Sequence, residues 1–144
     1  MLPFAEKDQQ TMEASVHNLK TRRRILVVDD NRDAAQMLAL LLKMGGDETH
    51  TAHDGEEALE RAAAIRPEII ILDIGLPKLN GYEVCRSIRE QPWGQPITMV
   101  AVTGWAREED RQKSQEAGFN GHLIKPVDHR VLTKLVADLQ AEVN

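Results

Sequence analysis

The sequence has little that would support a secreted, membrane-spanning or nucleic-acid-binding protein. Its 144 residues include a single cysteine, Cys85, which excludes an internal disulfide and a multi-cysteine metal site and favours a reducing compartment. No apolar run approaches the roughly 18 residues of a membrane-spanning helix, and Met1–Arg24 lacks the apolar block of a signal peptide. The net charge of −5 argues against nucleic acid as the main partner, because phosphate binding needs a basic face. We therefore expect a cytoplasmic protein without direct membrane contact.

The composition that remains is ordinary for a globular domain, with 42% hydrophobic and 28% charged residues. The length suits one domain. Residues 1–24 are polar, carry single scattered apolar residues and end in three consecutive arginines. We interpret residues 1–24 as a tail or linker with at most one short helical stretch, and residues 25–144 as the folded domain.

Five short strand-like segments alternate with five segments of helical periodicity. The predicted strands are residues 25–28, 48–52, 69–72, 97–102 and 121–124, and the helical spacing covers residues 34–42, 58–65, 84–88, 108–117 and 131–139. Continuous Val, Ile and Leu runs are typical of parallel strands that helices cover on both faces. The pattern predicts an α/β fold of the flavodoxin-like (βα)5 type, a three-layer sandwich whose parallel five-stranded sheet has the order 2-1-3-4-5.

Polar side chains stand where four of the predicted strands end. Asp29 and Asp30 follow the first strand, Asp73 follows the third, and Thr103 and Lys125 follow the fourth and fifth. The carboxyl ends of parallel strands meet at one edge of the sheet, where ligands bind. The first and third strands are neighbours in the predicted order, so the acids on them should lie about 5 Å apart.

Three carboxylates in such a position repel one another. Two unit charges about 5 Å apart cost roughly 3 kcal/mol at an effective dielectric near 20, and a divalent cation would neutralise them. All-oxygen ligation favours Mg²⁺ or Mn²⁺ over Zn²⁺. Together with the hydroxyl of Thr103 and the ammonium of Lys125, these acids suit a phosphoryl group, and one carboxylate could be the nucleophile.

At these positions the sequence resembles the response-regulator receiver domain of bacterial two-component signalling. The resemblance covers residues 24–143. It is carried by four motifs that occur in order, each at the end of an apolar strand: Val27–Asn31, Ile71–Pro77 with Gly81–Val84, Val102–Gly104, and Lys125-Pro126. Each motif is weak alone, but the ordered set is specific.

The resemblance implies a role for each matching residue. Asp73 would accept the phosphoryl group from a phosphohistidine, and the metal would be held by Asp29, Asp30, Asp73 and the backbone carbonyl of Gly75. Thr103 and Lys125 would bind the phosphoryl oxygens.

Three further positions have counterparts in the family. His122 stands at the position of an aromatic switch residue that moves together with Thr103, and the Lys125-Pro126 bond at the position of a cis peptide. Residues Gly75 and Trp105 stand where the family tunes the lifetime of the phosphoryl group.

The resemblance also implies partners. These would be a histidine kinase or a histidine phosphotransfer domain, with self-association as a further option and no enzymatic activity beyond the domain's own phosphorylation and dephosphorylation. The stretches Asp73–Pro77, Thr103–Trp105 and Ala117–Phe119 are most similar to the C-terminal receivers of hybrid sensor histidine kinases. In that arrangement the domain would be attached to a membrane sensor.

Other interpretations compete with this one. A metal-dependent phosphohydrolase of the haloacid-dehalogenase type also forms an aspartyl phosphate, but it needs a second acid two residues later, where Gly75 stands. A nucleotide-binding module lacks its glycine-rich loop after the first strand. A scaffold receiver that is never phosphorylated would not need the intact acids. Without the family, His122 would be a partly buried strand residue, and Cys85 a buried helix residue.

Overall fold

In the computed structural model, the described residues are 22–104 and 108–143. Most of the expected tail, residues 1–24, therefore lies outside the described residues, as does Trp105. The strands are β1 (Arg24–Val28), β2 (Glu48–Ala52), β3 (Ile69–Asp73), β4 (Thr98–Thr103) and β5 (Gly121–Ile124). The helices are α2 (Arg32–Met44), α3 (Gly55–Ile65), α4 (Gly81–Arg89), α5 (Glu108–Ala117) and α6 (His129–Val143), with a short 3-10 helix, η1 (Pro92–Gly94).

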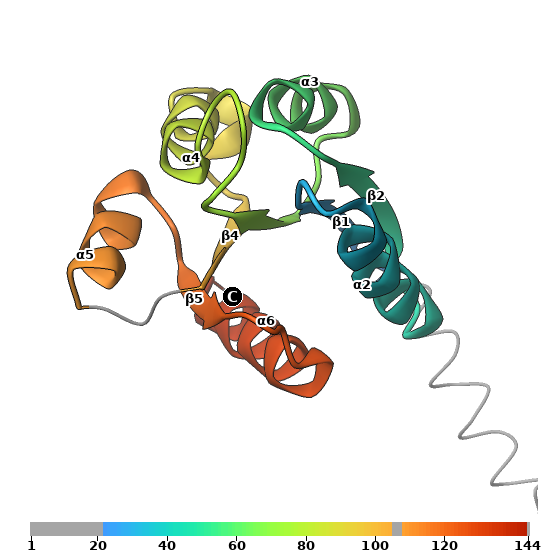
Figure 1. The fold of residues 1–144 in the computed structure, drawn as a ribbon. Coiled ribbons are helices and arrows are strands. Elements are labelled where there is room, and N and C mark those ends of the chain that lie inside the picture. The colour runs from blue at the N-terminus through green and yellow to red at the C-terminus, as the bar shows by residue number, and fades with distance from the viewer. Residues whose placement is uncertain (1–21, 105–107, 144) are drawn as a thin grey trace, which may run out of the picture.

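All described strand pairs are parallel, and the sheet order is β2-β1-β3-β4-β5 (Figure 1). The predicted fold class and strand order are confirmed. The differences are small. Asp73 and Thr103 are the last residues of their strands rather than the first residues of the following loops. The 3-10 helix was not predicted, because three residues are too few to show a period.

The helices form two layers, one on each face of the sheet. Helices α3, α4 and α5 cover one face, and α2 and α6 cover the other (Figure 1). The two faces of each strand alternate between these layers: Leu26 and Ile70 belong to the first core cluster, whereas Ile25 and Ile69 belong to the second. Both clusters consist of buried hydrophobic residues, so the central strands are covered on both faces.

Three helices begin at the edge of the sheet where the predicted site lies, and each has an N-cap side chain. Asn31 accepts a hydrogen bond from Ala34 N at 3.1 Å, Asp54 from Glu57 N at 2.8 Å, and Asn80 from Glu83 N at 3.0 Å. Such caps satisfy backbone N–H groups that the helix leaves unpaired. They also fix the loops that connect the strands to the helices at this edge.

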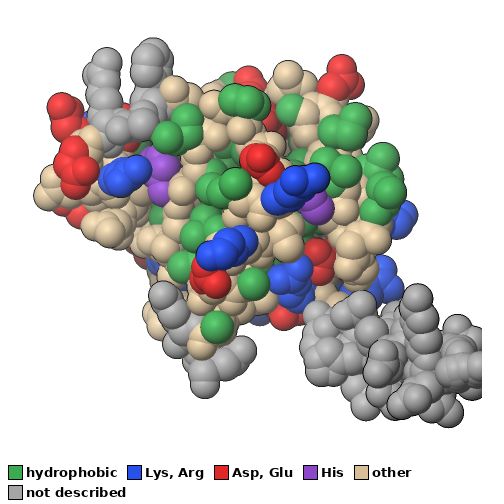
Figure 2. Space-filling model, turned by 90° about the horizontal axis from the view of Figure 1, so that it is seen from below, with side chains coloured by type: hydrophobic (Ala, Val, Ile, Leu, Met, Phe, Trp, Pro, Cys, Tyr) green, Lys and Arg blue, Asp and Glu red, His purple; other side chains and the backbone are tan. Residues whose placement is uncertain are grey.

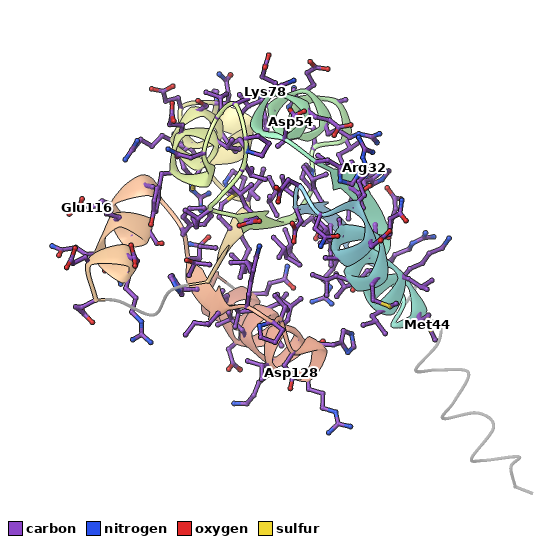
Figure 3. All side chains as sticks on the ribbon, viewed as in Figure 1. Arg32, Met44, Asp54, Lys78, Glu116 and Asp128 are labelled. Carbon is purple, nitrogen blue, oxygen red and sulfur yellow. The ribbon has the colours of Figure 1, made fainter. Side chains whose placement is uncertain are left out.

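The loop between β3 and α4 is tied to the start of α3. The side chains of Lys78 and Asp54 lie side by side (Figure 3), with Lys78 Nζ 3.5 Å from Asp54 Oδ2. Lys78 has a positive φ of 70°, a conformation that L-residues adopt uncommonly.

None of the helices in the described ranges is long and apolar enough to span a membrane.

Cys85 lies in the core between α4 and the sheet and is fully buried. Burial raises the pKa of its thiol to about 11, so only about a thousandth of the thiol is thiolate near pH 8. We expect iodoacetamide to alkylate Cys85 at least about a hundredfold more slowly in the native protein than in denaturant. Intact-mass spectrometry over time would measure both rates, and equal rates would contradict the buried position.

Candidate functional site

Three carboxylates converge at the carboxyl ends of β1 and β3. Asp29 and Asp30 follow β1, and Asp73 ends the neighbouring β3, which pairs with β1 up to Val28 and Leu72. One carboxylate oxygen from each of the three aspartates lies within 4.8 Å of the others. Asp73 is buried, Asp29 is half-buried and Asp30 is exposed. The structure therefore brings together the acids that the sequence analysis placed at this edge.

Lys125 adds a positive charge to these acids. Its Nζ lies 2.7 Å from Asp73 Oδ2 and 4.0 Å from Asp29 Oδ2. Burial lowers the pKa of Lys125, but the hydrogen bond and the attraction from Asp73 outweigh burial, so that the pKa is raised overall. The ammonium therefore stays charged at neutral pH. The Lys125-Pro126 peptide bond is cis, at the position where the resemblance placed one.

The carboxylate of Asp73 is held from both sides. Its Oδ1 accepts a hydrogen bond from Gly75 N at 3.0 Å, and its Oδ2 accepts the hydrogen bond from Lys125. The loop behind it is closely packed, because a Cβ on Gly81 would lie 2.8 Å from the backbone oxygen of Asp73. Gly81 N also donates to Ile74 O at 2.9 Å. Asp73 is thus the most buried and most constrained acid of the three.

Thr103 and His122 lie on the neighbouring strands β4 and β5. Thr103 is buried and ends β4, whose register pairs it with Ile124, two residues beyond His122. The ring of His122 is half-buried, and its Nδ1 lies 3.4 Å from Ser114 Oγ on α5. The proposed switch residues therefore occupy adjacent strands, next to α5.

The acid cluster has the chemistry of a site for a hard divalent cation. Each ligand atom is a carboxylate oxygen, and no histidine or cysteine of the described residues belongs to the cluster. Burial raises the pKa of Asp29, and the nearby Asp73 raises it further against the opposing effects of Asn31 and Lys125. Crowded carboxylates of this kind fit Mg²⁺ or Mn²⁺ and do not favour Zn²⁺.

The raised pKa of Asp29 predicts a pH dependence of stability in protein free of divalent cations. A carboxyl with a higher pKa in the folded state stabilises the fold below its ordinary pKa of 3.8, and this contribution is lost as the pH rises through the folded pKa. At neutral pH in EDTA, Asp29→Asn should therefore raise the free energy of unfolding by about 1 kcal/mol, and with it the melting temperature. Mg²⁺ should reverse the order of the two proteins.

Thermal unfolding of both proteins with EDTA and with Mg²⁺ would measure this effect. Asp33→Asn is the matched control, because Asp33 is exposed in the first turn of α2. There a negative charge favours the helix, so neutralisation should slightly lower stability. A lower melting temperature for Asp29→Asn in EDTA would contradict the prediction.

The sequence analysis missed one histidine at this edge. His53 directly follows β2, and its Nδ1 lies 3.0 Å from the backbone oxygen of Asp29. Four strand ends were interpreted, and the end of β2 was not, because β2 has a weak hydrophobic pattern. The available signal was the position of His53 immediately after β2, a strand of the same parallel sheet.

Comparisons with known proteins agree with this arrangement. Residues 25–137 match the family model described as the response regulator receiver domain. The chain is 40% identical over 108 residues to the alkaline phosphatase synthesis transcriptional regulatory protein PhoP of Bacillus subtilis, covering 75% of this chain and 44% of PhoP. It thus spans about half the length of the curated response regulators that it matches.

Solved structures show the same likeness. The chemotaxis protein CheY4 of Vibrio cholerae superposes with a TM-score of 0.78 at 30% identity, over 82% of this chain and 98% of CheY4. The signal receiver domain of a signal transduction histidine kinase from Syntrophus aciditrophicus has a TM-score of 0.76 at 30% identity, over 85% of this chain and 92% of that domain.

The phosphohydrolase and nucleotide-binding alternatives belong to other families and lose their support. The chain belongs to the family of response-regulator receiver domains, the phospho-accepting domains of two-component signalling.

Proposed function

We propose that this receiver domain, residues 25–144, takes a phosphoryl group onto Asp73 from the phosphohistidine of a histidine kinase or a histidine phosphotransfer domain. One observation carries the proposal. The buried Asp73 carboxylate has Lys125 Nζ at 2.7 Å and belongs to a group of three acids whose oxygens lie within 4.8 Å of one another. No ordinary structural role requires three acids and a lysine from three separate segments of the chain to converge.

The transfer changes two bonds. An oxygen of the Asp73 carboxylate bonds to phosphorus while the phosphorus–nitrogen bond of the donor breaks. The bonding pair stays on the imidazole, which takes up a proton from water. Dephosphorylation follows when water supplies the new oxygen to phosphorus, so that Asp73 returns to a carboxylate and inorganic phosphate leaves.

The residues around Asp73 have separate tasks in this proposal. Lys125 would bind a phosphoryl oxygen as a point charge, and the Thr103 hydroxyl would donate to another. Asp29, Asp30 and Asp73, with the carbonyl of Gly75, would hold Mg²⁺ or Mn²⁺. When bound, the metal neutralises charge on the phosphoryl oxygens.

Phosphorylation would then bias the positions of Thr103 and His122. The phosphorylated Asp73 side chain would carry about −1.5 to −2 charges in place of the single charge of its carboxylate, beside the acids Asp29 and Asp30. An inward movement of the Thr103 hydroxyl toward the phosphoryl oxygens would leave room for the His122 ring to reorient. The two arrangements would present different surfaces of β5 and α5 to a partner or to a second copy of the domain.

The phosphodonor must reach Asp73, and Lys125, which donates a hydrogen bond to Asp73, also lines a hollow beside α2. A hollow of about 520 Å³ between α2 and the loop after β5 is lined by Asp29, Leu38, Lys125 and Pro126, among others. Figure 2 shows hydrophobic side chains interspersed with charged ones on the face of the domain seen from below. Met37, at 59% exposure, also lines the hollow. We propose that the histidine-bearing domain docks here.

The resemblance also supports a proposal on the cellular context. We propose that the domain is the C-terminal receiver of a bacterial hybrid sensor kinase, that residues 1–24 link it to the kinase, and that it works in the cytoplasm. The likeness to the receiver domain of a histidine kinase from Syntrophus aciditrophicus supports this context.

Acetyl phosphate with Mg²⁺ tests the proposal directly. Intact-mass spectrometry should show the addition of one phosphoryl group, and beryllofluoride with Mg²⁺ should raise the melting temperature. EDTA should abolish both effects. A wild-type protein that acquires neither group would be the scaffold receiver considered above and would contradict the proposal.

A further inference from the structure

We propose that His53 is a positioning residue for the metal-binding acids. Its ring holds the backbone of Asp29 in place, so that the Asp29 carboxylate can bind the cation without a movement of the β1–α2 loop. The inference rests on the proposed function for the identity of the cation.

The backbone of Asp29 is bonded on both sides to the end of β2. Asp29 N donates to Ala52 O at 3.1 Å, and His53 Nδ1 lies 3.0 Å from Asp29 O. A carbonyl oxygen can only accept a hydrogen bond, so His53 must carry its proton on Nδ1. Two consecutive residues thus satisfy both polar groups of the Asp29 backbone.

His53 is itself held by the start of α3. The backbone N of His53 donates to Glu57 Oε1 at 2.7 Å, and Glu57 N donates to the N-cap Asp54 at 2.8 Å. The imidazole is half-buried. The backbone of His53, from which the ring extends, is therefore tied to the first turn of a capped helix.

Asp29 needs such support because its carboxylate stands in a repulsive cluster. Its Oδ1 accepts a hydrogen bond from Asn31 N at 2.9 Å, but its other contacts at the site are the acids Asp30 and Asp73 and the distant Lys125. Repulsion among these acids disfavours the close arrangement that a cation needs, and the hydrogen bond from His53 fixes the Asp29 backbone against the end of β2, the strand on the other side of β1 from β3. The imidazole does not belong to the acid cluster, so it acts on the metal only through Asp29.

Groups that orient metal ligands commonly change metal affinity by 10–100-fold when they are removed. A bond to the ligand's backbone belongs at the lower end of that range, so His53→Ala should weaken Mg²⁺ binding about tenfold. His53→Asn should stay within about twofold of wild type, because the Nδ2 of asparagine replaces the Nδ1 donor of histidine. His53→Gln, whose amide extends beyond that position, should behave like His53→Ala.

Isothermal titration of Mg²⁺ at neutral pH and constant ionic strength measures these affinities. His50→Ala is the matched control, because His50 is a half-buried β2 histidine that contacts Glu48 instead. Its Mg²⁺ affinity should equal that of wild type. A second readout needs no metal: the Asp29 amide should exchange its hydrogen faster in His53→Ala than in wild type and His53→Asn, with EDTA present.

The outcomes separate the two proposals. Equal Mg²⁺ affinity in wild type and His53→Ala, or equal loss in His53→Ala and His53→Asn, overturns the role of the Nδ1 donor. A wild-type protein that binds no Mg²⁺ overturns the proposed function instead. In that case the exchange of the Asp29 amide still decides whether His53 holds this backbone.

Discussion

Asparagine in place of Asp73 will abolish phosphorylation by acetyl phosphate, with a loss of at least about a thousandfold. The amide has nearly the shape of the carboxylate but is not a nucleophile. Its oxygen can still accept the hydrogen bond from Gly75 N. Its NH₂ group would face the Lys125 ammonium, which now lies 2.7 Å from Asp73 Oδ2, so that Lys125 loses its acceptor.

Intact-mass spectrometry after incubation with acetyl phosphate and Mg²⁺ measures this loss. Asp33→Asn is again the control, since Asp33 is exposed outside the acid cluster, and it should be phosphorylated like wild type. Circular dichroism would show that the variant is folded. Phosphorylation of Asp73→Asn at the wild-type rate would assign the acceptor to another residue, which borohydride reduction and peptide mapping would locate.

The largest loss of stability is expected at Arg89, far from the chemistry. This half-buried guanidinium at the end of α4 makes five hydrogen bonds of 2.7–3.0 Å, and four of its acceptors are backbone carbonyls. The acceptors are Gly118 O, Gly94 O, Gln95 O, Ile97 O and Asn120 Oδ1. Lysine carries its three donors on one nitrogen, so it cannot donate to all of these oxygens.

Arg89→Lys should therefore leave several acceptors without a donor and cost about 3 kcal/mol. For a domain of this size the melting temperature should fall by roughly 10 °C. Urea unfolding and thermal unfolding would measure the change. The control is Arg86→Lys on the same helix, where the side chain is exposed and a change within about 0.5 kcal/mol is expected. Equal stability of the two variants would show that the hydrogen bonds of Arg89 contribute nothing measurable.

Much of the fold could be predicted from the sequence because its signals are local. The apolar runs at Ile25–Val28 and Ile69–Leu72 are typical of strands covered on both faces, and helical periodicity separates them. Parallel strands then force their carboxyl ends to one edge. That geometric rule, together with the predicted strand order, was enough to predict that Asp29, Asp30 and Asp73 would be neighbours, and the structure agrees.

Contacts that depend on loops could not be predicted in this way. The acceptors of Arg89 are carbonyls, which every residue carries, so no residue type in the sequence indicates them. The hydrogen bond from His53 to Asp29 likewise joins a side chain to a backbone oxygen across two strands. The sequence also could not predict how deeply each acid is buried, which distinguishes the buried Asp73 from the exposed Asp30.

The sequence by itself determined the class of fold, the strand order and the set of charged groups at the carboxyl edge, because these follow from hydrophobic patterning and chain direction. Only the tertiary structure decided which carboxylate lies beside Lys125 and which histidine supports the acids. Those contacts depend on side-chain direction and on distances of a few ångströms between segments far apart in the chain, and a linear pattern carries no record of either.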